Sequence, residues 1–279
     1  MFVDAHQHFW IYNPSEYGWI TDSMAAIRRD FLPEELRPEL DRNGFCGSVA
    51  VQTRQTIEET RWLLKLAEES TWILGVVGWV DLCARDVRDQ LANVAKHPKL
   101  VGIRHIVQSE VDDQFLLRAD FLRGISMLQD FNLPYDILIK PKHLTVAAEF
   151  VERFPNQRFV LDHLAKPFIK DGEIEAWATD IRRLASFPNV FCKLSGLVTE
   201  ADWHYWELEQ ITPYLDVAFE CFGAKRLMIG SDWPVCLVAA SYRSVIGVIK
   251  RYLETQPPTT QTAVLAGNAE VFYRLAVSK

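Results

Sequence analysis

Two histidines near the start of the chain have a spacing that suits metal or acid-base chemistry. His6 and His8 lie two residues apart, directly after the apolar run at residues 2–5. In an extended strand, residues two apart share a face, so we expect both imidazoles to point the same way. Imidazole pairs of this kind bind Zn²⁺ or a similar ion. A bare pair is also compatible with a purely structural, hydrogen-bonded role.

Polar side chains recur where the later apolar runs end. They are Gln52, Trp79, Arg104, His105, Lys140, His163, Lys193 and Asp232. A nitrogen from His163 and a carboxylate oxygen from Asp232 would complete a four-ligand mononuclear site with His6 and His8. The combination is a sharper signal than the histidine pair alone. The alternative is that all four are hydrogen-bonded residues without chemistry.

Eight short apolar runs alternate with amphipathic segments along the whole chain. The runs are residues 2–5, 48–52, 73–77, 100–104, 134–139, 159–162, 190–194 and 227–230. Runs that are apolar on both faces are typical of parallel strands covered by helices. The helical segments include Phe121, Gly124, Ile125 and Leu128 at a period of 3.6 residues. We therefore predict one (β/α)8 barrel over residues 1–279, with a doubly wound sheet as the alternative.

The barrel fold explains why polar residues at strand ends are informative, because active sites of such barrels lie at the carboxyl ends of the strands. The connection at residues 9–47 is the longest, and its opening is rich in aromatic residues and turn formers. We expect it to lie over the barrel mouth, either covering substrate or packing its own aromatics. Pro257 and Pro258 mark a turn before a terminal helix expected at about residues 259–275.

Composition favours a small-molecule partner. The formal net charge is −7 and the isoelectric point is about 5.6, which opposes general attraction to nucleic acid or to an anionic membrane. The opening residues do not have the pattern of a signal peptide, so we expect no leader, and no apolar run is long enough to span a membrane. Five scattered cysteines favour reduced thiols, so we expect a cytoplasmic protein. Neither the oligomeric state nor the stereochemistry of the substrate follows from these observations.

Several motifs resemble the amidohydrolase superfamily, and within it the sugar lactonases related to L-fuconolactonase, L-rhamnonolactonase and pyrone-dicarboxylate lactonase. The motifs are DAHQHFW at 4–10, GIRH at 102–105, LDHLAKP at 161–167, KLSG at 193–196, GSDWPV at 230–235 and GNAEVFYRL at 267–275. The resemblance covers nearly the whole chain and implies a lactone-opening hydrolase whose core site is His6, His8, His163 and Asp232.

The chain departs from the metal-dependent members of that superfamily in one respect. Many of them carry Lys or Glu after strand 4 and His after strand 5, whereas this chain has Arg104-His105 and Lys140 there. A binuclear centre is therefore not expected. The resemblance implies at most one divalent ion such as Zn²⁺, which activity does not necessarily require.

Lactone hydrolysis assigns roles to these residues. It needs an activated water and a stabilised oxyanion, so we expect Asp232 to be the general base and His163, Arg104 and His105 to complete the catalytic set. The expected substrate contacts are Trp10, Gln52, Trp79, Lys140, Lys193 and Trp233. Two alternatives remain: a metal-dependent decarboxylase or hydratase acting on an unsaturated acid, and a non-catalytic barrel that binds a sugar acid.

Overall fold

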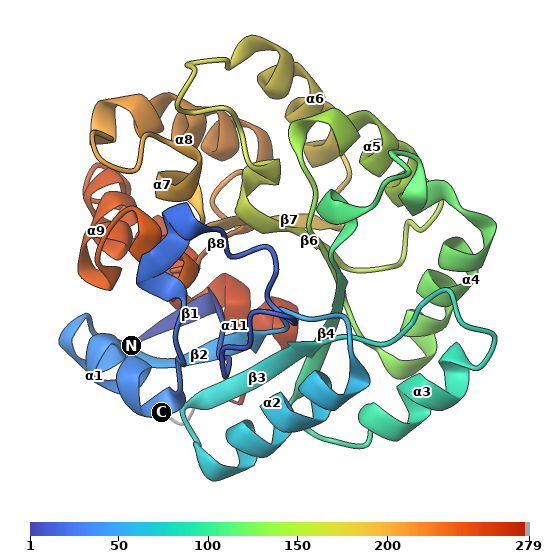
Figure 1. The fold of residues 1–279 in the computed structure, drawn as a ribbon. Coiled ribbons are helices and arrows are strands. Elements are labelled where there is room, and N and C mark those ends of the chain that lie inside the picture. Colours follow the sequence, from blue (N-terminus) through green and yellow to red (C-terminus); the bar gives the residue numbers. More distant parts are fainter. Residues whose placement is uncertain (277–279) are drawn as a thin grey trace.

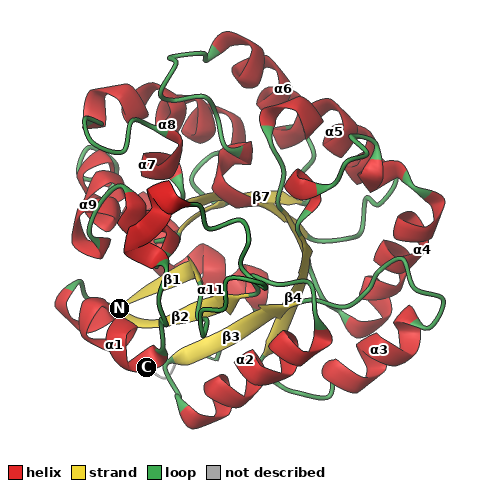
Figure 2. Ribbon diagram, viewed as in Figure 1, coloured by secondary structure: helices red, strands yellow, loops and turns green. Residues whose placement is uncertain are grey.

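Eight parallel strands form one sheet in the order β1 to β8. The structure is a computed structural model that describes residues 1–276. The strands are β1 (Phe2–Gln7), β2 (Phe45–Val51), β3 (Ile73–Gly78), β4 (Leu100–His105), β5 (Tyr135–Ile137), β6 (Phe159–Leu161), β7 (Val190–Leu194) and β8 (Leu227–Ile229). Helices surround the strands on the outside (Figures 1 and 2). The predicted (β/α)8 barrel is confirmed, and the doubly wound sheet is not observed.

The barrel closes between β1 and the segment that follows β8. The backbone N–H of His8 donates to the carbonyl of Trp233 at 2.6 Å, and that of Asp232 donates to the carbonyl of His6 at 2.8 Å. The buried Asp4 carboxylate accepts from the backbone N–H of Ser231 at 2.9 Å. The seam therefore joins the histidine pair and Asp232 directly.

Helices follow the strands along the chain, and the last three of them come after β8. They are α1 (Pro33–Arg42), α2 (Ile57–Glu69), α3 (Val87–Val94), α4 (Ala119–Leu128), α5 (Leu144–Glu152), α6 (Glu175–Ala185), α7 (Leu197–Glu200), α8 (Leu208–Phe222), α9 (Tyr242–Leu253), α10 (Pro258–Thr262) and α11 (Asn268–Tyr273). The predicted apolar face of α4, which begins with Phe121, is buried against the barrel. The Thr56 hydroxyl caps α2 by accepting from the Glu59 backbone N–H.

Short single turns complete the connections. They are η1 (Asp22–Ile27), η2 (Val107–Ser109), η3 (Phe115–Leu117), η4 (Gln129–Phe131), η5 (Pro141–His143), η6 (Asp162–Ala165), η7 (Val235–Val238) and a π-helical turn, η8 (Ala263–Gly267). The predicted terminal helix is thus interrupted: η8 separates α10 from α11. Within residues 1–276, no helix is both long and apolar enough to cross a membrane.

The connection expected at residues 9–47 is more ordered than its sequence suggests. It contains η1 and α1, and β2 begins at Phe45, three residues earlier than predicted. Irregular backbone is concentrated before Pro33, which starts α1 at a position where its missing N–H costs nothing. The segment carrying η1 lies across the barrel mouth (Figure 1), where Trp19 and Met24 line a cavity.

The opposite end of the barrel is filled by α11. Ala269, Phe272 and Tyr273 of α11 pack in one buried cluster with Val3 of β1 and Val49 of β2. Figure 1 shows α11 behind the strands, away from the segment that covers the mouth. This packing leaves the carboxyl ends of the strands as the open end of the barrel.

Candidate active site

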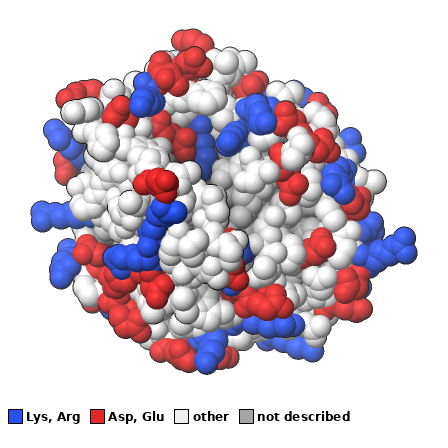
Figure 3. All heavy atoms as spheres, viewed as in Figure 1, with Lys and Arg blue, Asp and Glu red and all other residues white. Residues whose placement is uncertain are grey.

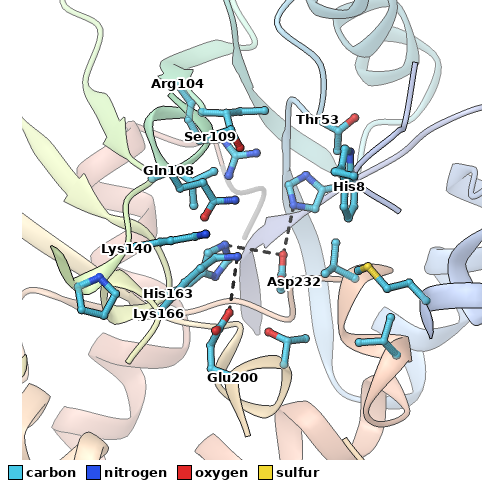
Figure 4. A pocket seen from close by; sticks show the side chains of 18 of the residues that line it. His8, Thr53, Arg104, Gln108, Ser109, Lys140, His163, Lys166, Glu200 and Asp232 are labelled. Atoms are coloured by element: carbon cyan, nitrogen blue, oxygen red, sulfur yellow. Dashed lines mark hydrogen bonds and ion pairs between the residues drawn. The ribbon is translucent and has the colours of Figure 1, made fainter. Parts of the chain in front are cut away.

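Four predicted site residues converge at the carboxyl ends of β1, β6 and β8. The Nε2 atoms of His6 and His8 are 3.1 Å apart. Oδ1 of Asp232 lies 3.2 Å from Nε2 of His8, 3.7 Å from Nε2 of His6 and 3.8 Å from Nε2 of His163. Figure 4 shows His8, His163 and Asp232 facing one another. All four side chains are nearly inaccessible to solvent.

Backbone features hold these groups together. β1 continues through Gln7, so His6 and His8 point the same way. Gly230 precedes the Ser231-Asp232 pair, and a Cβ there would lie 2.7 Å from Cβ of His6, so a side chain would push the first histidine away. Asp232 itself has φ of +57°, a conformation that L-residues other than Asn and Asp rarely adopt.

His8 has one nitrogen committed to the backbone and one free. Its Nδ1 is 2.7 Å from the carbonyl oxygen of Val51, which only an N–H can satisfy. Nε2 is then an acceptor, and it faces the carboxylate oxygen of Asp232 at 3.2 Å. Two acceptors at this separation repel each other unless a proton or a metal cation lies between them.

The donor set fits a divalent ion. His6, His8 and Asp232 form a group whose ligand atoms all lie within 4.8 Å of one another. Their separations of 3.1, 3.2 and 3.7 Å match the spacing of about 3.3 Å between ligands of a tetrahedral zinc with bonds near 2.0–2.1 Å. His163 belongs to a second group, with His6 and Asp162.

His163 begins an unusual left-handed turn. Residues 163–166 have φ values of +53°, +52°, +59° and +56°, and none of them is glycine. At about 1–2 kcal/mol per residue, the turn costs roughly 4–8 kcal/mol. Nδ1 of His163 lies 2.8 Å from Oγ of Ser195, and the next residue is Gly196, where a Cβ would clash with the imidazole. Packing around the ring therefore holds a strained backbone in place.

A layer of buried charge supports His6 from below. Lys193 is fully buried, and its Nζ lies 2.6 Å from Oδ2 of Asp136, 3.0 Å from Oδ1 of Asp162 and 3.1 Å from Nδ1 of His6. Arg104 donates to Oδ2 of Asp162 at 2.9 Å, and its Nη1 is 3.4 Å from Nε2 of His6. Because cations and anions alternate in this layer, each buried charge lies next to an opposite charge.

Burial favours the neutral form of the three imidazoles. Burial lowers the pKa of His163 to about 4. Burial, together with the Lys193 ammonium in the case of His6, also lowers the pKa values of His6 and His8. Burial by itself would raise the pKa of the Asp232 carboxyl, but the surrounding histidines outweigh it and the net shift is downward. Asp232 is therefore an anion in the working pH range.

A cavity of about 500 Å³ opens above these groups. His8, Arg104, His163 and Asp232 form part of its wall, and the remaining lining side chains are mixed in character. They include Trp19, Met24, Thr53, Ile106, Gln108, Ser109, Leu138, Lys140, Lys166, Phe168, Glu200, Trp203, Val235 and Val238. Figure 3 shows this face hollowed near its centre, with basic and acidic side chains at the edge of the hollow.

Not every predicted site residue lines this cavity. Lys193 and Gln52 lie beneath it, and the Gln52 side chain donates to the carbonyl of Arg104 at 3.1 Å. His105 is bonded to Glu110 at 2.6 Å and stacks on a phenylalanine, outside the cavity wall.

The three predicted tryptophan contacts also lie elsewhere. Trp10 is fully buried and its indole N–H donates to the backbone carbonyl of Arg29. Trp233 packs edge-on against Phe31, and Trp79 lines a separate shallow pocket. Trp10 and Trp233 are core residues, and none of the three tryptophans lines the cavity.

Two charged cavity residues were not among the predicted site residues, namely Lys166 and Glu200. Lys166 is part of the LDHLAKP motif, but if the strand continued through this motif, its side chain would point to the face opposite that of His163. Glu200 comes from α7, and burial raises the pKa of its carboxyl, an effect that Lys166 opposes. The left-handed turn that brings Lys166 into the cavity has no glycine to signal it.

Comparison with known proteins gives consistent matches. An amidohydrolase family model matches residues 3–275. The chain is 40% identical over 275 residues to an L-fucono-1,5-lactonase of Burkholderia multivorans, covering 95% of this chain and 93% of that protein. It is 39% identical over 278 residues to an L-fucono-1,5-lactonase of Burkholderia ambifaria, covering 98% and 95%. A crystal structure of an amidohydrolase from Burkholderia multivorans with bound zinc superimposes with a TM-score of 0.96, at 40% identity over 99% and 100% of the two chains.

Proposed function

Because this chain belongs to the amidohydrolase family, we propose that it hydrolyses the ring ester of a sugar lactone to the corresponding hydroxy acid. The observation that carries the proposal is the meeting of an ionised carboxylate with three imidazoles and a guanidinium at the base of one cavity. L-Fucono-1,5-lactone is the first substrate to test, because two relatives that match nearly the whole chain act on it.

Asp232 acts as the general base. Its carboxylate takes a proton from water as the water oxygen attacks the lactone carbonyl carbon. When the tetrahedral intermediate collapses, the bond from that carbon to the ring oxygen breaks. The same carboxyl group then returns the proton to the departing ring oxygen. The sum of the two steps is the addition of one water molecule, with Asp232 regenerated.

Arg104 and His163 stabilise the oxyanion. The guanidinium of Arg104 carries a permanent positive charge and is held by Asp162 at the cavity wall. If the Ser195 hydroxyl donates to Nδ1 of His163, the proton of that neutral ring is on Nε2, the nitrogen that faces Asp232. Both groups then donate to the carbonyl oxygen as it gains negative charge.

A divalent ion would be held by His6, His8 and Asp232, with His163 close by. When bound, it would supply Lewis-acid polarisation of the carbonyl and would lower the pKa of water. The permanent charge of Arg104 offers electrophilic assistance that does not depend on such an ion. We propose that the ion assists and that turnover does not require it.

Lys140 attracts the carboxylate of the product. Its side chain is exposed and reaches into the cavity, as Figure 4 shows. Hydrolysis creates a carboxylate where the neutral lactone carbonyl stood, so a cation near the mouth attracts the product after ring opening.

The test is a panel of aldonolactones and dicarboxylic lactones assayed by acid release with a pH indicator. We expect turnover of a sugar lactone above the spontaneous rate, and a rate at or near background for Asp232→Asn. The assay is repeated after dialysis against a chelator and after addition of Zn²⁺, which decides whether the ion is needed. No lactone turned over by the wild type would refute the proposed function, and zinc-dependent decarboxylation of an unsaturated acid would replace it.

A further inference from the structure

The left-handed turn at residues 163–166 delivers two side chains to the cavity, His163 and Lys166. In a helical turn, residues three apart lie on the same face, and reversing the hand of the turn leaves this unchanged. Leu164 and Ala165, between them, are fully buried in the core. The strained backbone therefore places Lys166 beside His163, at the reacting end of the site.

Lys166 faces Glu200 across a short gap. Its Nζ lies 3.6 Å from Oε1 of Glu200, which is beyond hydrogen-bonding distance. Only 22% and 25% of the two side chains are exposed. Figure 4 shows the dashed line from the Lys166 ammonium to Glu200, with Glu200 on the far side of the ammonium from Lys140. The ammonium and the carboxylate thus retain hydrogen-bonding capacity directed into the cavity.

We propose that Lys166 and Glu200 together bind the hydroxyl group on the carbon next to the lactone carbonyl. This inference rests on the proposed lactonase function. A hydroxyl accepts one hydrogen bond and donates another, so it pairs with an ammonium donor and a carboxylate acceptor at once. An oxygen about 2.8 Å from both atoms fits a gap of 3.6 Å.

The position of Lys166 and Glu200 explains why they would bind the hydroxyl next to the carbonyl and not another hydroxyl of the ring. Nε2 of His163 is 3.8 Å from Oδ1 of Asp232, so the turn that carries Lys166 adjoins the attacked carbonyl. A lactone carbonyl has the ring oxygen on one side and a single carbon on the other. The hydroxyl of that carbon, at position 2, is the one within reach.

A neighbouring ion pair shows what an ordinary contact between the same two segments looks like. Nζ of Lys170 lies 3.1 Å from Oδ2 of Asp202, and 62% of the lysine side chain is exposed. Neither residue lines the cavity above Asp232. Lys170→Met is therefore a matched control for Lys166→Met, because it removes a lysine charge from the same connection without altering the cavity.

The experiment measures kcat/KM on an aldonolactone and on its 2-deoxy analogue for the wild type, Lys166→Met, Glu200→Gln and Lys170→Met. On the hydroxylated lactone we expect each pair variant to lose about 10–100-fold, the usual effect of a hydrogen bond to a charged group. On the 2-deoxy lactone, the pair variants and the wild type should agree within about threefold, a margin far smaller than that loss. Lys170→Met should match the wild type on both substrates.

Equal losses on both lactones, or no loss on either, would overturn the inference while leaving lactone hydrolysis intact. A wild type that hydrolyses neither lactone would instead overturn the proposed function, and this inference with it. Lys166→Gly guards against a folding artefact, because glycine adopts the left-handed conformation freely. We expect it to retain the melting temperature of the wild type or exceed it, while showing the substrate-selective loss of Lys166→Met.

Discussion

Replacing Asp232 by asparagine should abolish most of the catalytic activity while leaving the folded structure intact. The residue has φ of +57°, and asparagine tolerates that conformation as readily as aspartate does. The amide keeps an oxygen in the position that faces His8 and fits the same space. What it loses is the capacity to take a proton from water.

The expected loss follows from that single function. General base catalysis contributes about 100- to 10,000-fold, equivalent to about 3–5.5 kcal/mol of transition-state stabilisation. The neighbouring rings offer little substitution: Nδ1 of His8 is committed to a carbonyl, and burial lowers the pKa of His163 to about 4. We therefore expect kcat to fall by at least about two orders of magnitude.

The assay is initial-rate acid release at saturating lactone, corrected for spontaneous hydrolysis, with thermal unfolding measured on the same samples. Asp202→Asn, at a partly exposed carboxylate outside the cavity, is the matched control and should keep wild-type kcat. Zinc affinity is measured in parallel by competition with a chelating dye. A kcat within tenfold of wild type in folded Asp232→Asn would remove this residue from the base role.

Three further predictions concern metal, buried charge and pH. His8→Ala removes one of three clustered ligand atoms and should weaken Zn²⁺ binding at least about tenfold by isothermal titration calorimetry. Lys193→Met leaves two buried carboxylates without their shared cation, so denaturant unfolding should show a loss of about 3–5 kcal/mol, against about 1 kcal/mol or less for Lys170→Met. Burial raises the pKa of Asp4 to about 6, so the native state binds its proton more tightly than the unfolded chain. This group's contribution of about 3 kcal/mol is therefore present below pH 4 and lost as the pH rises through 6, and Asp4→Asn should flatten that part of the stability profile.

The sequence predicted the fold well because a barrel repeats one signal eight times. Apolar runs mark the strands. Because the carboxyl ends of the strands form the mouth of a barrel, the residues that follow each run lie at the mouth. This rule predicts His6, His8, His163 and Asp232 as site residues. The prediction was less successful for large aromatics. Trp10 and Trp233 are near the mouth in sequence, but the cost of leaving an indole in water drives them into the core.

The cavity wall was harder to predict because side-chain direction depends on backbone torsions that the residue types do not reveal. Lys166 follows a histidine by three positions, and its direction depends on four consecutive left-handed residues. His105 ends a strand like its neighbour Arg104, but the alternation along β4 turns the two side chains in opposite directions. Tertiary packing, which local sequence does not encode, decides the direction of Lys166, whereas the direction of His105 follows from strand alternation alone.

The way α11 plugs the barrel makes the support of the site depend on a segment that is synthesised late. The Tyr273 hydroxyl donates to Asp136 at 2.7 Å, Asp136 contacts Lys193, and Lys193 contacts His6. During synthesis, the first strand leaves the ribosome hundreds of residues before this tyrosine does. A nascent chain can therefore contain all eight strands and still lack the contacts that α11 makes beneath His6.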